Sequence, residues 1–334
     1  MKKIVQLSFL IILAGCSRQM EYPTGHIPEE LKNFQDANSV YDDYNSDLHV
    51  IGTEYILQFS TNRYSYGKQF DFVKMRGGFR WNQDNGDFAE EVENITQWSM
   101  YDSITTSANE LGPYSREFEV ENGYKYVMLY ATDLSGNFDI KFSYELNSDH
   151  GMEIQTACAS PQGVSFVNTP ANELYPSFMI RGETSNFGSV PPIEKMFYCS
   201  DKSGNFDIYQ IDFPSNQNIL SFLASKAVFP STPVGVLNSG FDDKCPYFAN
   251  NRLIFASNRP GGFGGYDLYY SIYENGEFSA PVNFGEKINT PFDEYRPVIE
   301  APPQFDNEFM LFSSNRPGGK GGFDLYYTGI PKVD

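Results

Sequence analysis

Residues 257–270 read Ser-Asn-Arg-Pro-Gly-Gly-Phe-Gly-Gly-Tyr-Asp-Leu-Tyr-Tyr, and the stretch returns as Ser-Asn-Arg-Pro-Gly-Gly-Lys-Gly-Gly-Phe-Asp-Leu-Tyr-Tyr at residues 314–327. Apolar residues lead into both copies, and aromatic and aliphatic residues end them. The proline and the four glycines in the middle permit a tight, irregular connection between two strands. Each copy therefore predicts a β-hairpin, and the repetition predicts a fold that is built from such hairpins.

Weaker copies of the hairpin occur earlier, at Ser-Thr-Asn-Arg (60–63), Thr132-Asp133 and Ser200-Asp201. In every copy an aspartate begins the second strand, and these aspartates are Asp71, Asp139, Asp207, Asp267 and Asp324. They are 57 to 68 residues apart, which implies longer loops on the usual four-stranded repeat of a propeller. We interpret the five aspartates as structural residues of the repeat.

A second signature precedes the hairpins, an asparagine followed five residues later by an acid. It pairs Asn38 with Asp43, Asn168 with Glu173, Asn238 with Asp243, and Asn289 with Glu294, whereas the second repeat has Thr105, Thr106 and Glu110. The two signatures divide each repeat into four strands. The sequence therefore predicts an all-β fold, a five-bladed β-propeller of four-stranded antiparallel blades. A sixth blade within residues 80–105 is the alternative.

The two ends of the chain predict how the ring closes. The last repeat ends near Ile330 with room for three strands, while residues 31–36 have no blade of their own. We expect residues 31–36 to pair with the last strand near residues 324–328. This pairing would remove two open sheet edges.

The N-terminal residues have the features of a signal peptide. Lys2 and Lys3 precede an apolar run that is too short to span a bilayer as a stable helix, and Leu-Ala-Gly-Cys ends it at residues 13–16. This ending resembles a bacterial lipobox, and an ordinary cleaved signal is the alternative. The resemblance implies a signal peptide at 1–16 with lipid on Cys16, a flexible tether at 17–30 and a single propeller domain at 31–334.

The same resemblance predicts an outer-membrane lipoprotein. Residues 17–21 lack the acidic run that resembles a surface-export signal, so the periplasmic face is preferred to the cell surface. A net charge of −19 disfavours nucleic acid and anionic lipid headgroups as partners. Contact with the membrane is therefore expected through the lipid anchor only.

The repeated acids are the obvious catalytic candidates, because propellers include glycosidases that use a carboxylate pair. Such a pair needs two unlike environments, whereas Glu110, Glu173, Asp243 and Glu294 stand in equivalent places of the repeat. We therefore interpret them as structural acids that bind backbone N–H groups or the loop arginines Arg63, Arg259 and Arg316. No catalytic residue is predicted.

No metal or cofactor site is predicted either. His26, His49 and His150 have no spacing typical of a metal or catalytic cluster. Calcium on the Asp-rich loops is the alternative, although no twelve-residue ligand pattern is present. Cys158, Cys199 and Cys245 are expected to be small buried side chains, with a Cys199–Cys245 disulfide as the alternative.

The motifs resemble the TolB-type, WD-like β-propeller repeat, in a form common in envelope proteins of Bacteroidetes. The resemblance is closest at residues 238–330. With no catalytic pattern beside it, we expect a non-enzymatic lipoprotein whose propeller face binds an envelope protein partner, such as an outer-membrane protein complex. The alternative is a carbohydrate-binding or glycan-cleaving propeller of a polysaccharide-uptake system. A pair of acids that breaks the symmetry of the blades would favour that alternative.

Topology predicts where a partner would bind. In an antiparallel blade, the loop between the second and third strands and the loop that enters the next blade emerge on one side, so both signatures share a face. Mixed charge and loop aromatics make this face the predicted partner-binding site. Its predicted residues are Arg63, Tyr64, Asp243, Arg259, Phe263, Glu294 and Arg316.

Overall fold

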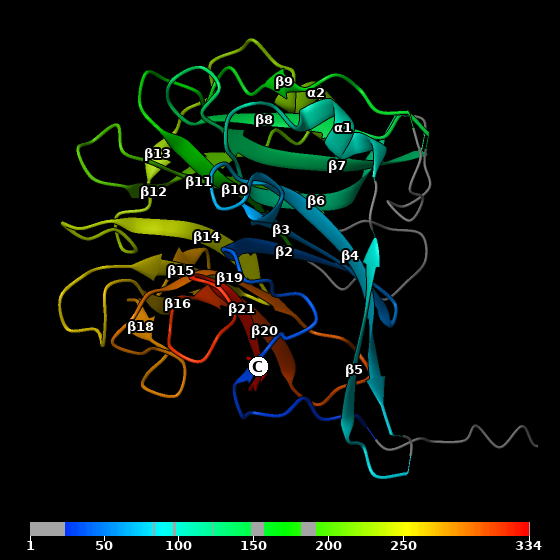
Figure 1. Ribbon diagram of the computed structural model, residues 1–334. Coiled ribbons are helices and arrows are strands. Elements are labelled where there is room, and N and C mark those ends of the chain that lie inside the picture. Colours follow the sequence, from blue (N-terminus) through cyan, green and yellow to red (C-terminus); the bar gives the residue numbers. More distant parts are fainter. Residues whose placement is uncertain are drawn as a thin grey trace, which may run out of the picture.

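The computed structural model describes residues 24–82, 84–95, 98–121, 123–147, 157–181 and 192–333. It is all-β with five four-stranded antiparallel blades in a ring, so the predicted five-bladed propeller is confirmed (Figure 1). Cys16 and the first part of the predicted tether lie outside the described residues, as does His150. No helix of the described part is long and apolar enough to cross a membrane.

The strands follow the chain blade by blade. Blade 1 contains β2 (Asp43–Ile51), β3 (Glu54–Thr61), β4 (Asp71–Trp81) and β5 (Phe88–Ile95). Blade 2 contains β6 (Glu110–Val120), β7 (Gly123–Thr132), β8 (Asp139–Tyr144) and β9 (Gln162–Gly163). Blade 3 contains β10 (Glu173–Ile180), β11 (Ile193–Ser200), β12 (Asp207–Asp212) and β13 (Thr232–Pro233).

Blades 4 and 5 carry the two strong repeats. Blade 4 contains β14 (Asp243–Ala249), β15 (Arg252–Ser257) and β16 (Asp267–Glu274), with β17 (Glu277–Phe278) and β18 (Val282–Asn283) both paired to β16. Blade 5 contains β19 (Glu294–Glu300), β20 (Glu308–Ser314), β21 (Asp324–Ile330) and β1 (Lys32–Asn33). The short helices are η1 (Arg63–Ser65), α1 (Ser99–Ile104) and α2 (Ile219–Leu223). The described residues of the range 80–105 therefore contain the end of β4, β5 and α1, and they form no sixth blade.

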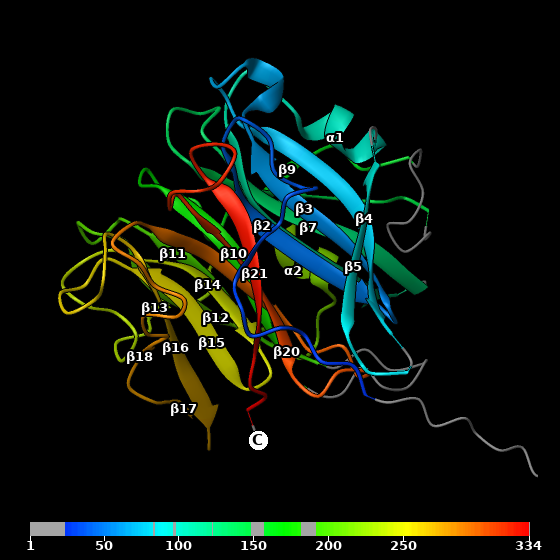
Figure 2. The ribbon, with the colours of Figure 1, turned by 60° about the horizontal axis from the view of Figure 1, so that its bottom comes forward.

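The N-terminal segment closes the ring, as predicted. Lys32 pairs with Tyr327 and Asn33 with Tyr326, which makes β1 the outer strand of blade 5. Figure 2 shows this segment running beside β21. The side chain of Asn33 also donates to Asp324 at 2.9 Å, so the closure joins two elements from opposite ends of the chain.

The glycine-rich loops need glycine because each loop packs closely against the loop that enters the next blade. Gly261 has a φ of +93°, a region that favours glycine. A Cβ on Gly264 would lie 2.2 Å from the carbonyl oxygen of Phe292 in the loop that enters blade 5. Asp267 fixes the loop by accepting hydrogen bonds from the N–H groups of Phe263 (2.7 Å) and Gly264 (3.0 Å). The repeated motif is therefore a blade-to-blade junction.

The asparagine of the second signature is a bridge within the sheet. The side chain of Asn289 accepts from the N–H of Leu268 at 2.8 Å and donates to its carbonyl at 3.0 Å. Asn38, Asn168 and Asn238 bridge Leu325, Ile140 and Ile208 in the same way. Thr105 has no amide with which to copy this pair of bonds.

The first strands of the blades contact one another in a ring around the axis, in the order β2, β6, β10, β14 and β19. Each has a bulge after its second residue, where the backbone is left-handed. The residues at these bulges are Asn45, Gly112, Tyr175, Cys245 and Arg296, with φ between 46° and 60°. The bulge gives every inner strand a first half and a second half with different surroundings.

Candidate functional site

The predicted acid–arginine pairs form within single blades, at the starts of the inner strands. Arg259 Nη2 lies 2.6 Å from Asp243 Oδ1, and Arg316 Nη2 lies 2.9 Å from Glu294 Oε1. Both carboxylates are fully buried. Arg63 makes the matching pair with Asp43 at 2.6 Å. These ion pairs hold loops to strands, which is a structural role. Each carboxylate neutralises the charge of its arginine inside the fold.

The loop aromatics of the predicted partner-binding face are exposed. Tyr64 is 59% and Phe263 is 45% accessible to solvent. The two tryptophans pack inside the fold: Trp98 is buried against Tyr101 and Tyr126, and Trp81 packs on Phe305.

Blade 2 departs from this pattern. Glu110 has threonine partners, with Thr106 Oγ1 at 2.7 Å and Thr132 Oγ1 at 3.1 Å, but no arginine. Burial, with a smaller contribution from the charge of Asp71, raises the pKa of Glu110 to about 7 in spite of the hydrogen bonds from Thr106 and Thr132, which lower it. Burial also raises the pKa of Asp71. This acid pair is an irregular copy of the structural motif, because both residues occupy repeat positions.

A different cluster lies where the inner strands continue past their bulges. It contains Asp47 from β2, Arg116 from β6, Tyr247 from β14 and Glu300 from β19. Arg116 Nη1 lies 3.2 Å from both carboxylate oxygens of Asp47, and Arg116 Nη2 lies 3.1 Å from Glu300 Oε1. One guanidinium group therefore bridges two carboxylates that come from different blades. We call these four residues the axial cluster.

Buried donors hold Asp47 in place. The backbone N–H of Ser115 donates to Asp47 Oδ2 at 2.8 Å, and the hydroxyl of Ser115 does so at 3.0 Å. Tyr126 donates to the hydroxyl of Ser115 at 2.9 Å. Asp47 is fully buried, so these donors and Arg116 fix the position of its carboxylate.

Glu300 has another environment. Its side chain is 22% exposed, and it accepts a hydrogen bond from the hydroxyl of Tyr247 at 3.1 Å. Burial raises the pKa of Glu300 to about 7; Arg116 lowers it and Asp47 raises it. Arg116 is stacked over the rings of Tyr114 at 4.9 Å and Tyr247 at 5.7 Å. The cluster thus contains a buried carboxylate and a partly exposed carboxyl group that is half protonated near neutral pH.

Asp47 and Glu300 were not predicted from the sequence, because neither belongs to a repeated motif. Counted from the acid that begins each inner strand, Asp47 stands where the other blades have Tyr114, Ser177, Tyr247 and Val298. Glu300 stands where they have His49, Arg116, Met179 and Ala249. An alignment of the five inner strands would have shown two acids that break the symmetry of the blades, the signal that favours the glycan-active alternative.

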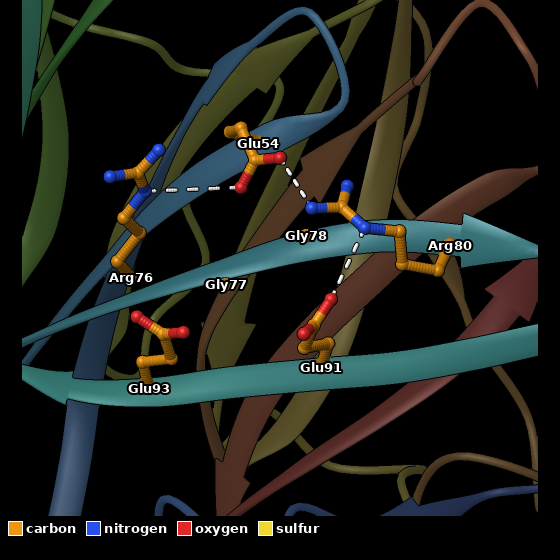
Figure 3. A pocket seen from close by; sticks show the side chains of 7 residues that line it. All are labelled: Glu54, Arg76, Gly77, Gly78, Arg80, Glu91 and Glu93. Carbon is orange, nitrogen blue, oxygen red and sulfur yellow. Dashed lines mark hydrogen bonds and ion pairs between the residues drawn. The ribbon is translucent and has the colours of Figure 1, made fainter.

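A shallow cavity of about 240 Å³ lies on the outer strands of blade 1, away from the axis (Figure 3). Gly77 and Gly78 form its floor. Arg80 pairs with Glu54 and, at 3.2 Å, with Glu91. Glu54 and Glu91 are thereby neutralised, and the paired charges favour a surface ion network over a catalytic site.

Within the described ranges no group of three or more His, Cys, Asp or Glu residues could hold a metal ion. None of Cys158, Cys199 and Cys245 forms a disulfide, so the alternative Cys199–Cys245 bridge is not present; Cys199 and Cys245 are buried as expected, whereas Cys158 is half-buried. Burial raises the pKa of Cys199 to about 12, which makes it a poor nucleophile.

No family model and no curated protein match this sequence. Solved structures do match its fold. An endo-arabinase from Bacteroides thetaiotaomicron is 10% identical, with 93% of this chain and 99% of that chain covered and a TM-score of 0.53. A GH62 hydrolase in complex with xylotriose is 9% identical, with 92% and 97% covered and a TM-score of 0.51. A GH43 β-xylosidase/α-arabinofuranosidase from a compost microbial metagenome is 9% identical, with 90% and 94% covered and a TM-score of 0.50.

These findings correct two expectations. The TolB-type, WD-like assignment is wrong, because no family model supports it and the similar structures are glycoside hydrolases. The expectation of a non-enzymatic scaffold that binds a protein partner is wrong on the same finding. A hairpin motif of this kind specifies how a blade contacts its neighbour. Propellers of different function can share that contact, so the motif does not identify the function. At 9–10% identity the similarity shows the fold alone.

Proposed function

We propose that this chain is a glycan-cleaving β-propeller, and that the axial cluster is its active site. The observation that carries the proposal is the pair of carboxyl groups, Asp47 and Glu300, that breaks the symmetry of the blades beside the axis. Glycoside hydrolysis uses two carboxyl groups in unlike protonation states. The names of the similar structures, which include an endo-arabinase and a β-xylosidase/α-arabinofuranosidase, support pentose-containing glycans as the first substrates to test.

Glu300 has the properties of a proton donor. With a pKa of about 7 it still carries a proton in much of the population at neutral pH, and it is the more exposed of the two groups. The role of Glu300 is to protonate the glycosidic oxygen as the bond to the leaving group breaks. Tyr247 holds the carboxyl group in place through its hydroxyl.

Asp47 is assigned the role of the ionised partner. Ser115 and Arg116 stabilise its negative charge, but they also cover it completely. A water molecule or sugar can reach this carboxylate only when the guanidinium of Arg116 moves away. The proposal therefore requires that a bound glycan displaces Arg116 from Asp47.

The cellular location of the protein is likewise a proposal, and it rests on the sequence. The lipobox-like ending at Cys16 supports a lipid-anchored protein of the outer membrane, and the tether residues support the periplasmic face. An enzyme there would act on glycan fragments. Loss of palmitate labelling in a Cys16→Ala variant would support the anchor, and labelling that persists would exclude it.

Hydrolysis of arabinan, xylan and aryl arabinofuranosides and xylosides tests the activity, with release of reducing sugar or aryl alcohol as the readout. We expect turnover with the wild-type chain and its loss in Glu300→Gln and Asp47→Asn. Glu277→Gln is the matched control, because Glu277 is an exposed acid on the edge of blade 4. No turnover and no binding of any of these glycans, or turnover that survives in both variants, would refute the proposal.

A further inference from the structure

Arg296 lies on the propeller axis at the bulge of β19, and it is fully buried. Its Nη2 donates to the carbonyl of Pro113 at 2.9 Å, and its Nε donates to the carbonyl of Ser46 at 3.4 Å. The guanidinium thus reaches from blade 5 to backbone groups of blades 1 and 2. No carboxylate of the described residues forms an ion pair with it, and Nη1 has no hydrogen-bond partner.

Further unpaired polar groups stand at the equivalent bulge of the neighbouring inner strand. Asn45 occupies the bulge of β2, the position that Arg296 occupies in the neighbouring inner strand, and is fully buried. Its side-chain amide contacts the hydroxyl of Tyr44 without a hydrogen bond of regular geometry, and the hydroxyl of Ser46, the next residue, forms no hydrogen bond. Buried polar groups are nearly always paired, so several unpaired ones at one place indicate a ligand that the protein atoms alone do not supply.

The charge of the site selects the kind of ligand. A buried guanidinium without a counter-ion is costly, and a metal cation beside it would be repelled. The ring of Tyr175 lies 5.5 Å from the guanidinium and provides part of the compensation. Cys245, at the bulge of β14, is a free and fully buried thiol whose pKa is raised by burial, so it is present as the neutral form. The nearby carboxylates Asp47 and Glu300 pair with Arg116, and no ion pair within the described residues involves Arg296.

We infer that a small monovalent anion such as chloride binds on the axis beside Arg296. The guanidinium supplies charge and the Nη1 donor, and the amide of Asn45 and the hydroxyl of Ser46 supply neutral donors. Because Asn45, Ser46 and Arg296 are fully buried, the site favours a compact ion over a branched one. This anion would join the inner strands of blades 5 and 1, which lie on either side of the ring closure, and its role is independent of the axial cluster.

Bromide is the direct probe, because it replaces chloride and can be located by anomalous scattering. Crystals of the wild-type chain that are soaked in sodium bromide should show an anomalous peak within hydrogen-bond distance of Arg296 Nη1. Water alone at this place, with no anomalous signal, would overturn the inference.

Thermal unfolding gives a second readout in solution. The melting temperature of the wild-type chain should rise in a saturable manner with sodium chloride, compared with sodium gluconate at equal ionic strength. Arg296→Met should lose this dependence. Lys244→Met should keep it, because Lys244 lies beside the bulge of β14 but is already paired with Asp242 at 3.3 Å. Equal melting temperatures in the two salts would contradict the inference. If Arg296→Met does not fold, the presence or absence of the bromide peak in wild-type crystals tests the anion site.

Discussion

The first halves of the five inner strands differ from their second halves in one respect, their symmetry. Each strand begins with a buried acid that ties its own blade together: Asp43, Glu110, Glu173, Asp243 and Glu294. Past the bulge the equivalent positions hold unlike residues, among them the acids Asp47 and Glu300. A residue that recurs in every blade has a structural role that is common to all blades. A ligand, in contrast, requires a particular set of groups at one place. The comparison therefore separates residues that build the propeller from residues that could act on a substrate.

The largest expected effect is the loss of activity in Glu300→Gln. The amide keeps the shape of the side chain and removes the proton that the leaving group needs, so turnover should fall by about 10²- to 10⁴-fold. The melting temperature should stay near that of the wild-type chain, because the glutamine can still accept from Tyr247. Initial rates on the best glycan, together with thermal unfolding, check both parts. Full activity in this variant would remove Glu300 from the site.

Glu294→Ala, in the first half of the same strand β19, should affect stability where Glu300→Gln affects activity. It leaves Arg316 buried without its counter-ion, and removing one partner of a buried ion pair costs about 3–5 kcal/mol of unfolding free energy. Burial and hydrogen bonding at Glu294 are complete, so we expect most of this range. Urea unfolding measures the loss. Unfolding at the wild-type urea concentration would show that the repeated acids are dispensable.

A smaller loss is expected for Asn289→Ala. The change removes both hydrogen bonds to Leu268 and leaves buried backbone groups unpaired, which costs about 1–3 kcal/mol. Blade 2, with Thr105 at the equivalent place, provides the comparison, because Thr105→Ala has no such bridge to lose. Urea unfolding of the two variants should therefore give different losses, and equal losses would contradict the bridging role.

Dependence on pH gives a further test of the comparison, because carboxyl groups in both halves of the inner strands have raised pKa values: Glu110 and Glu294 in the first halves and Glu300 in a second half. Glu110 and Glu300 have pKa values of about 7 in the folded protein, above the ordinary value of 4.5. The folded protein therefore holds protons that the unfolded chain releases, and the unfolding free energy falls as pH rises from about 4.5 to about 7. Glu110→Gln and Glu300→Gln should each reduce this slope.

Activity distinguishes the two groups. Turnover of the wild-type chain should decline as pH rises above about 7, because Glu300 loses its proton. The Glu110→Gln variant should show the same decline, since Glu110 belongs to the structural half. If the decline disappears in Glu110→Gln, the assignment of the two halves is reversed.

The propeller could be predicted because its signals recur. The Ser-Asn-Arg-Pro-Gly-Gly motif makes the same blade-to-blade contact in two repeats, and the asparagine signature makes the same bridge in four, so each copy supports the interpretation of the others. Closure by residues 31–36 followed from the strand that the last repeat lacks. The axial cluster has no such support, because Asp47 and Glu300 each occur once. Ring closure brings them together from opposite ends of the chain, and only their positions within the aligned inner strands indicate that they meet.

The most direct test of the two halves is a crystal structure of the Glu300→Gln variant with an arabino- or xylo-oligosaccharide. We expect the sugar at the axis, in contact with the side chain at position 300, with Arg116 displaced from Asp47. A sugar bound instead on the opposite face, beside Tyr64 and Phe263, with Arg116 still paired to Asp47, would contradict the claim that the unlike halves of the inner strands form the active site.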